Sequence, residues 1–384
     1  MKHLLEKISI LALSTMLVST FAVSPAIPQM IVHFAGQGIS QGQVEFLMTI
    51  TSFAIMISLL ANPIIVRFFS ERTIMMLGLV LMAIGGSMPF LLSSYLLVFL
   101  SRICLGLGIG LINARAINIV GTHFSGKERI QMMGLRGSAE VLGSATLTVL
   151  VGWLISLGWH AAFLVYLFAL VLLALFVLFV PEEEEEEIVG DLSEIKLTAQ
   201  MWKTGILLAF LAFFVINVNT FVTIRIPTMV VEQGFGTARE ASWILGSMQI
   251  MGIVAGTLFG ILVERLKDWL LPLSYVVFGV AVLGIAFSNN LWFLALGAMV
   301  SGFFYSVVLT IVFSQVTVHT PKPLLSAMMT IVLMGCNIGG ATASVLPNFL
   351  ETLHPSGAGA FGIYALACAL ISVGLIFRQL SSKK

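Results

Sequence analysis

Long apolar stretches, separated by short polar segments, follow one another along the whole chain. A helix that crosses the hydrocarbon layer of a membrane needs about 20 mostly apolar residues. Twelve stretches reach that length, and Pro and Gly interrupt many of them, as helices in lipid tolerate. We therefore predict twelve spans, at residues 8–32, 44–66, 73–93, 96–121, 131–156, 161–180, 204–230, 241–263, 270–288, 291–316, 325–349 and 358–378.

The first stretch has the basic start and apolar run of a signal peptide, with Lys2 and Lys7 ahead of it. The run continues past Pro25 and Pro28 to Val32, which is too long for the apolar region of a signal peptide. We interpret it as the first span.

Composition supports a chain that lies mostly in lipid. Hydrophobic residues make up 59% and charged residues 10%, with a mean hydropathy of +1.06, against about 45–50% and about 25% in soluble domains. This excludes a soluble enzyme, a nucleic-acid binder and a disordered scaffold. The net charge of +1 gives no signal for a polyanion partner, and three cysteines inside apolar runs form no disulfide or metal pattern. The predicted fold class is an all-α polytopic membrane protein.

Lys and Arg placement predicts the orientation, because cytoplasmic loops are enriched in both. With both termini inside, the cytoplasmic segments contain fourteen of the nineteen basic residues, and the external loops contain only Arg239. We expect both termini in the cytoplasm. Short external loops favour a bacterial protein of the cytoplasmic (inner) membrane.

The longest polar stretch, 181–203, begins with Pro181 and the run Glu182–Glu187. A charge run of this kind is usually solvated, so we expect a cytoplasmic acidic linker. It separates a six-helix bundle at 1–180 from a second at 204–384.

The two halves resemble each other. Ile27–Val32 ends the first span and the similar Ile226–Val231 ends the seventh, 199 residues later. Pro63–Arg67 leaves the second span, and Gly260–Glu264 leaves the eighth, 197 residues later. Duplicated halves related by an axis along the membrane normal are a transporter design, with the site between the halves and access that alternates by rocking.

These features resemble the major facilitator superfamily over essentially the whole chain. Its Gly-x-x-x-Asp/Glu-Arg/Lys loop motif is similar to Gly260, Glu264 and Arg265, whereas Pro63 and Arg67 replace the Gly and the acid in the first half. The Arg and spaced glycines of its fourth span match 102–110, and its Gly-Trp-x-x-x-Phe junction matches 158–163. The Gly-Pro signature of the drug/proton antiporter branch is absent from 143–148.

The resemblance implies roles for several residues. Arg102 stands at the family's arginine position, which is associated with proton coupling or substrate handling. The resemblance implies a gating role for the loop residues Gly260, Glu264 and Arg265. Arg67, at the corresponding position of the first half, carries a positive charge where the family motif has an acid, and it is also a predicted gating residue. Packing against carbonyls at a neighbouring helix break is the alternative for Arg102.

Ionisable groups inside spans are costly and are functional candidates by default. We count four arginines and one acid, Glu140, which lies about ten residues into the fifth span, roughly 15 Å at 1.5 Å per residue. Glu140 is the predicted carrier of a coupled proton. The alternative is a fixed ion pair with Arg136, four residues earlier on the same helix face.

The excess of arginines over acids suits a substrate with a carboxylate or phosphate. Arg225 precedes Pro227 where the first half has Ala26, which favours exposure to the cavity. The predicted substrate-binding residues are Arg225, Arg115, Arg136, Asn113, Asn217 and Asn219. Asn217 and Asn219 differ by two, so they point to different helix faces. For each asparagine the alternative is an interhelical hydrogen bond.

These features predict a secondary active transporter of a small organic solute that works by alternating access, with proton-coupled efflux as the expected mode. An importer or facilitator of a small organic anion and a transporter-derived receptor are the alternatives. No phosphate-binding or metal-binding motif supports an enzyme, and no cofactor is implied. The expected partners are the substrate, protons and the lipid bilayer, without nucleic acid; we expect a monomer.

Overall fold

The computed structural model describes residues 2–116, 118–124, 126–181, 198–321, 324–353 and 359–382. Within these ranges the chain is helical and contains no strand. The all-α prediction is confirmed.

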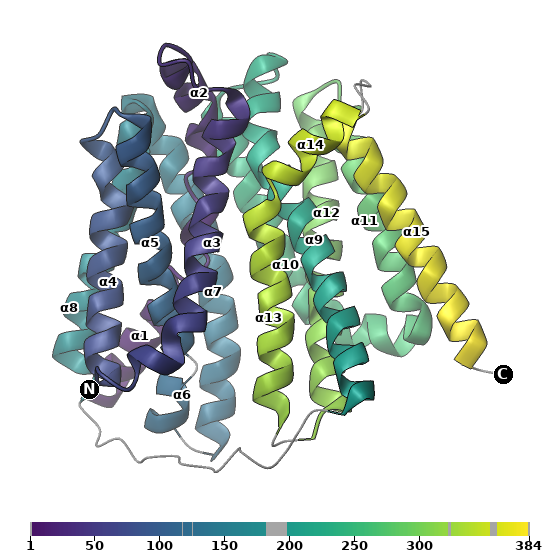
Figure 1. Cartoon of the computed structure of the whole chain (residues 1–384), viewed down its shortest axis with the longest axis horizontal. Coiled ribbons are helices and arrows are strands. Elements are labelled where there is room, and N and C mark those ends of the chain that lie inside the picture. Colours follow the sequence, from purple (N-terminus) through teal and green to yellow (C-terminus); the bar gives the residue numbers. More distant parts are fainter. Residues whose placement is uncertain are drawn as a thin grey trace. The chain divides into compact units, whose positions relative to one another are not determined.

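Each of the twelve predicted spans coincides with one helix or with a broken run of helices (Figure 1). In chain order the first six spans are formed by α1 (Lys2–Ser14), η1 (Ser19–Phe21), η2 (Ser24–Ala26), α2 (Ile27–Ala35), α3 (Gln41–Ile65), α4 (Glu71–Ser87), η3 (Met88–Phe90), α5 (Tyr95–Ala116), α6 (Asn118–His123), α7 (Gly126–Leu154), η4 (Ile155–Leu157), η5 (Trp159–Leu167) and α8 (Phe168–Phe179). The others are formed by α9 (Ala199–Glu232), α10 (Ala238–Leu266), η6 (Lys267–Trp269), α11 (Leu270–Ala286), α12 (Leu291–His319), α13 (Leu325–Thr342), α14 (Val345–Leu353) and α15 (Gly359–Ser382).

Nine helical segments in the described ranges are long and apolar enough to cross a membrane. A tenth is the bent pair Leu4–Ser14 and Ser19–Ala35, whose two parts meet at 53°. One of the nine, Ala238–Ala286, joins α10 and α11, and Ala327–Thr342 is apolar but shorter. The protein is therefore a multi-pass membrane protein.

The helices form two compact units. The first contains Met1–Glu186 and Ile224–Gly246, and the second contains Glu187–Thr223 and Ser247–Lys384. The end of α9 and the start of α10 thus belong to the first unit. The predicted boundaries 1–180, 181–203 and 204–384 stay a prediction, and most of the acidic linker lies outside the described residues.

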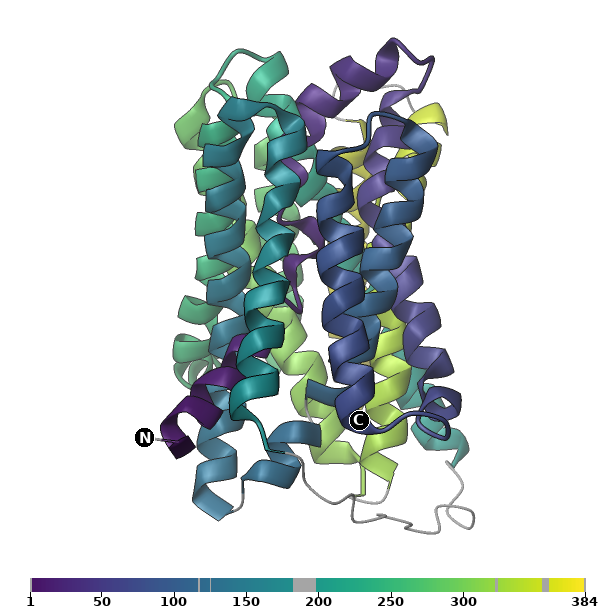
Figure 2. The same cartoon turned by 90° about the vertical axis from the view of Figure 1, so that its left-hand side faces the viewer.

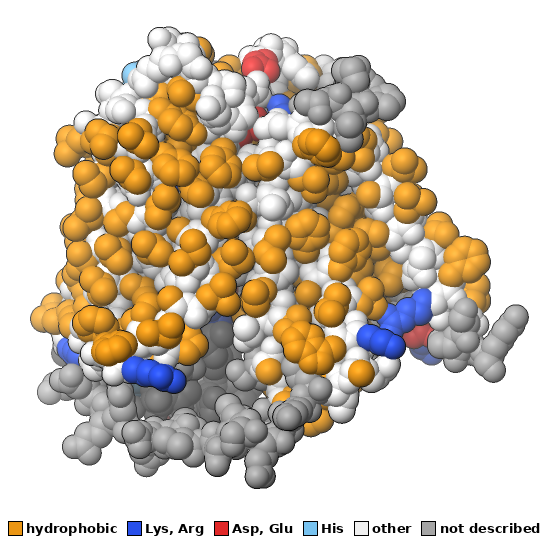
Figure 3. Space-filling view, in the orientation of Figure 1, with side chains coloured by type: hydrophobic (Ala, Val, Ile, Leu, Met, Phe, Trp, Pro, Cys, Tyr) orange, Lys and Arg blue, Asp and Glu red, His pale blue; other side chains and the backbone are white. Residues whose placement is uncertain are grey.

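Side chains on the helix surfaces match a lipid environment. On the face drawn in Figure 3, hydrophobic side chains cover the middle, most Lys and Arg side chains lie near its lower margin, and one lies near its upper margin. Five of the six tryptophans are 47–84% exposed, namely Trp153, Trp202, Trp243, Trp269 and Trp292. All five lie at or near helix ends. Trp is enriched at both membrane–water interfaces, so these positions mark the level of the lipid headgroups.

Below, the basic end of a unit is the end that carries the Arg67–Arg72 loop in the first unit and Arg265–Lys267 in the second. The distal end is the opposite one.

Glycine allows the closest helix contacts within each unit. Gly106 of α5 lies against the carbonyl of Thr51 in α3, and Gly302 of α12 lies against the carbonyl of Met248 in α10. A Cβ at either glycine would collide with that carbonyl. Figures 1 and 2 show a further close pair, α4 beside α5, where Gly78 and Gly108 face each other. Small residues that let backbones approach are the expected means of packing helices in lipid.

One buried tyrosine in each unit makes a hydrogen bond at an equivalent position of the internal repeat. Tyr166 donates its hydroxyl to the carbonyl of Ser19 at 2.9 Å, and Tyr364 donates to the Oδ1 of Asn217 at 2.5 Å. Tyr364 follows Tyr166 by 198 residues, and Asn217 follows Ser19 by 198 residues. Both tyrosines are almost fully buried. Equivalent positions of the two halves therefore make equivalent contacts between the first and last span of each.

Candidate transport and gating residues

Glu140 and Arg136 form an ion pair near the middle of α7. Arg136 Nη2 lies 2.5 Å from Glu140 Oε1, and the two side chains are 15% and 21% exposed. The i, i+4 spacing places them on one helix face. The alternative weighed for Glu140, an ion pair with Arg136, is therefore present in the structure.

The surroundings of α7 differ between its two ends. Toward the distal end, Val149 and Gly152 contact Gly246 and Ser242 of α10. Toward the basic end, a Cβ added at Gly134 or Gly137 would meet nothing within 4 Å. A charged pair that faced lipid would be costly. The half of α7 that carries the Arg136–Glu140 pair therefore has open space beside Gly134 and Gly137.

A second acid lies within a span. Glu45, in the first turns of α3, is only 2% exposed, and its Oε1 lies 3.4 Å from the Nε of Arg225 in α9. Gln41 donates to the same oxygen at 3.0 Å. The prediction that Glu140 is the only acid in the spans is wrong, because Glu45 is buried inside the apolar segment Gln41–Ile65.

Arg115 belongs to a cluster at the basic end of the first unit. Its Nη1 lies 2.5 Å from Glu71 Oε1, and its Nη2 donates to Asn62 Oδ1 at 2.9 Å. Arg115 is 5% exposed. The cluster connects α5, α4 and α3, so Glu71 supplies an acid next to the loop where Arg67 replaces the family's carboxylate. These contacts favour a structural role for Arg115.

Arg102 is fully buried and serves the helix break in the first span. It donates to the carbonyls of Thr20 and Leu47 at 2.9 and 3.3 Å and to the hydroxyl of Tyr166 at 3.4 Å. Its guanidinium also lies 5.7 Å from the ring of Phe163. A helix break in lipid leaves carbonyls that need donors. The alternative weighed for Arg102, a packing arginine at a helix break, describes these contacts.

Three of the four arginines assigned to spans have a carboxylate within 3.4 Å, and Glu45 and Glu71 provide two of these carboxylates. Of these four arginines, Arg102 alone has no such ion pair within the ranges that the structure describes. The sequence analysis counted four arginines against one acid in the spans and inferred an anionic substrate from this excess of positive charge. The excess is much smaller once Glu45 and Glu71 are included.

The predicted asparagines have different surroundings. Asn217 is buried and donates to the carbonyl of Gly339 and to Thr342 Oγ1, both at 3.0 Å, so it connects α9 with α13. Asn219 is half-buried, and in the described part of the chain its buried Oδ1 has no hydrogen-bond partner. Asn113 is half-buried in α5. Asn219 is thus the better candidate for contacting a solute.

The predicted gating residues lie at the basic ends. Gly260, Glu264 and Arg265 are exposed in the last turns of α10, and Arg67 is exposed after α3. Across the described ranges, no ion pair joins Glu264 or Arg265 to another side chain. Their gating role stays a prediction.

Sequence reasoning missed Glu45 and Glu71. Glu45 and Glu71 follow the serine N-caps Ser40 and Ser70 by five residues and one residue, so both lie close to the start of an apolar stretch, where a sequence alone does not show that an acid is buried. The sequence did contain a signal for these acids, because the arginines inside spans need hydrogen-bond acceptors. A search for acids near the ends of the spans would have identified both Glu45 and Glu71.

Comparisons with known proteins agree with the fold and with the absence of an enzyme motif. The family model of the Major Facilitator Superfamily matches residues 9–238 and 208–384. No curated protein sequence matches the chain. A solved variant of the peptide transporter POT in complex with alafosfalin shares 15% identity, with a TM-score of 0.71, and the match covers 96% of this chain and 93% of that one.

A second solved structure, a POT family transporter in complex with a thioalcohol-conjugated peptide, also shares 15% identity. Its TM-score is 0.73, and the match covers 99% of this chain and 96% of that one. These similarities extend over both halves of the repeat, and the protein is a secondary transporter, not an enzyme. The chain belongs to the major facilitator superfamily.

Proposed function

We propose that this chain is a proton-coupled transporter that exports a small organic solute, with Glu140 as the proton-carrying group. The observation that carries the proposal is the Arg136–Glu140 pair, half-buried near the middle of α7 beside open space. A carboxylate in this position can exchange its proton with an aqueous path, and the ion pair with Arg136 stabilises its charged form.

Protonation of Glu140 removes the partner of Arg136. Released from its ion pair, the guanidinium can donate to a carboxylate or carbonyl of the solute, and solute release allows the pair to form again. Because both events use Arg136, solute and proton compete for the same side chain. Competition of this kind is what exchange of a solute for protons requires.

The direction and location follow from the sequence features. The proposed direction is the efflux expected from the sequence; the arginine and glycines of the fourth span match the superfamily as a whole, and the Gly-Pro signature of the drug/proton antiporter branch is absent from 143–148. Basic loops on one side support cytoplasmic termini in a bacterial inner membrane. Asn219 and Asn113 are the proposed neutral contacts to the solute. We propose a monomer, as expected from the sequence.

A second candidate is proton-coupled uptake. The two solved structures named above are a peptide transporter POT in complex with alafosfalin and a POT family transporter in complex with a thioalcohol-conjugated peptide. Arg136 could bind the carboxylate of a peptide. In this case proton and solute would move together.

The sign of an imposed pH gradient separates the two candidates. The purified protein in proteoliposomes is screened with organic anions, small peptides and hydrophobic drugs. Accumulation driven by an acidic lumen supports exchange, and accumulation driven by an acidic exterior supports the second candidate instead. Flux without dependence on either gradient indicates a facilitator, and binding without flux indicates a receptor.

The variant Glu140→Gln tests the coupling residue. We expect loss of gradient-driven accumulation, with solute exchange across the membrane retained at zero gradient. The matched control is Glu128→Gln, which removes a carboxylate of the same helix that pairs with Lys7 at the basic end. Unchanged gradient-driven transport in Glu140→Gln would end the proposed role of this carboxyl.

A further inference from the structure

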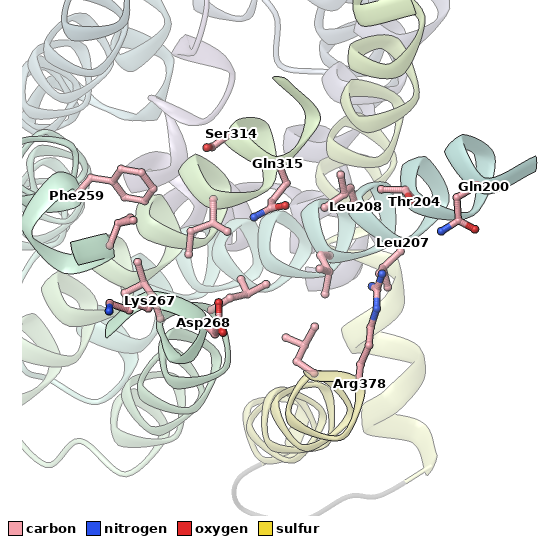
Figure 4. A pocket seen from close by; sticks show the side chains of 16 residues that line it. Gln200, Thr204, Leu207, Leu208, Phe259, Lys267, Asp268, Ser314, Gln315 and Arg378 are labelled. Atoms are coloured by element: carbon pink, nitrogen blue, oxygen red, sulfur yellow. The ribbon is translucent and has the colours of Figure 1, made fainter. Parts of the chain in front are cut away.

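A pocket of about 530 Å³ opens at the basic end of the second unit (Figure 4). It lies among α9, α10, η6, α11, α12 and α15, all within that unit. Nine of its lining residues are apolar, and the polar ones include Gln200, Thr204 and Gln315. The pocket is thus an apolar space with a polar rim.

Two cationic side chains and one acidic side chain line the polar rim of this pocket. Lys267 is in η6 and Arg378 is near the end of α15, and Figure 4 shows Asp268 between them. One carboxylate against two cations leaves the rim positively charged. Lys267 has φ 46°, in the left-handed region that non-glycine residues rarely adopt. Strained residues of this kind persist where their surroundings impose them and are often found at ligand sites.

Two exposed tryptophans indicate how deep the pocket lies in the membrane. Trp202, in the first turn of α9 beside Gln200, is 47% exposed, and Trp269, next to Asp268, is 56% exposed. Trp side chains prefer the level of the lipid headgroups. The charged rim therefore lies at headgroup level, and the apolar lining extends toward the acyl chains.

We propose that this pocket binds one anionic phospholipid. Its phosphate is held by Lys267 and Arg378, and one acyl chain lies along the apolar lining that includes Leu208 and Phe259. Three observations support this occupant: the positive rim, the apolar interior and the headgroup level of the opening. A soluble anion would use the rim alone, and an uncharged lipid would use the interior alone.

Binding is measured by native mass spectrometry on the full chain, with phosphatidylglycerol, phosphatidylethanolamine and phosphatidylcholine that have identical acyl chains. We expect phosphatidylglycerol to bind at least fivefold more tightly than the other two. Lys267→Gln and Arg378→Gln should each remove most of this preference. The matched control is Lys203→Gln, an exposed lysine of α9 at the same end that does not line the pocket.

Thr204→Trp tests whether the acyl chain enters the pocket, because it fills the space and leaves both cations in place. We expect weaker binding of phosphatidylglycerol, with a melting temperature in lipid-free detergent close to that of the native chain. Equal binding of the three lipids, equal loss in Lys203→Gln, or unchanged binding in Thr204→Trp would each overturn the proposal. Because the readout is binding, the outcome is independent of the transport direction and of the role of Glu140.

Discussion

The Nε of Arg225 lies 3.4 Å from Oε1 of Glu45, which joins the end of α9 to the start of α3. Nearby, the guanidinium of Arg239 lies 3.6 Å from the ring of Trp153. Gly152 allows α7 to approach Ser242 of α10 closely. The distal end of the first unit is thus held by an ion pair, a cation–π contact and a close helix contact between segments far apart in the chain.

The pair predicts strong coupling between its two members. Removing one partner of a buried ion pair leaves an uncompensated charge, which costs about 3–5 kcal/mol. We expect Glu45→Gln and Arg225→Gln each to lower the free energy of unfolding by about 3 kcal/mol, since Arg225 is 16% exposed. The double variant should lose less than the sum, with a coupling energy of about 1–3 kcal/mol.

Unfolding in mixed detergent with SDS measures these energies. Glu232→Gln, an exposed acid at the end of α9, is the matched control and should change stability by less than about 0.5 kcal/mol. Additive losses in the double variant would show that the two side chains do not act as a pair.

Two glycines of α7 predict opposite responses to the same substitution. A Cβ at Gly143 would collide with the backbone of Thr15, whereas at Gly137 it meets nothing within 4 Å. We expect Gly143→Ala to destabilise the protein by about 1–3 kcal/mol through overpacking. Gly137→Ala should be neutral or stabilise by about 0.5–1 kcal/mol, because alanine favours the helix. Thermal unfolding in detergent measures both, and a loss of similar size at Gly137 would contradict the packing argument.

The repeated tyrosines predict matched losses in the two units. Tyr166→Phe and Tyr364→Phe each remove the buried hydrogen bond that the hydroxyl donates, to Ser19 and Asn217 respectively. Tyr166→Phe also removes the acceptor of the longer bond from Arg102 at 3.4 Å. A buried hydrogen bond contributes about 0.5–1.5 kcal/mol net, so we expect both variants to lose about 1 kcal/mol. Tyr95→Phe is the control, since its bond to the Gln43 carbonyl is exposed. A loss of stability in only one of the two variants would show that the equivalent tyrosines of the two halves do not contribute equally to stability.

The sequence predicted those parts of the fold that depend on local composition. Twelve apolar stretches became helices, because lipid leaves a backbone few alternatives. The offsets of 199 and 197 residues already indicated the repeat that Tyr166 and Tyr364 display at 198. The i, i+4 pair of Arg136 and Glu140 was accessible for the same reason, since its spacing lies within one helix.

Contacts between distant helices were not accessible in this way. Glu45 and Arg225 are 180 positions apart, and Glu71 and Arg115 are 44 apart. Nothing in a single sequence shows which acid faces which arginine. A buried arginine must have acceptors, but whether these are carboxylates, as for Arg115, or carbonyls, as for Arg102, depends on helix breaks and crossings that only the structure shows.

Arg102 predicts a clear difference between arginine and lysine. Its guanidinium donates in three directions, to Thr20, Leu47 and Tyr166, and the planar fork of arginine is suited to this, whereas lysine concentrates its donors at one point. Arg102→Lys would keep the charge but leave at least one of these acceptors without a donor, at a cost of about 1–3 kcal/mol. We expect a lower melting temperature for Arg102→Lys, with a matched control in Arg72→Lys, whose guanidinium donates to Val177 and Val180 at a more exposed helix end. If Arg102 acts mainly as a charge in transport, Arg102→Lys would instead keep its stability and lose gradient-driven flux, so measuring both quantities on the same preparation separates the packing role from the coupling role.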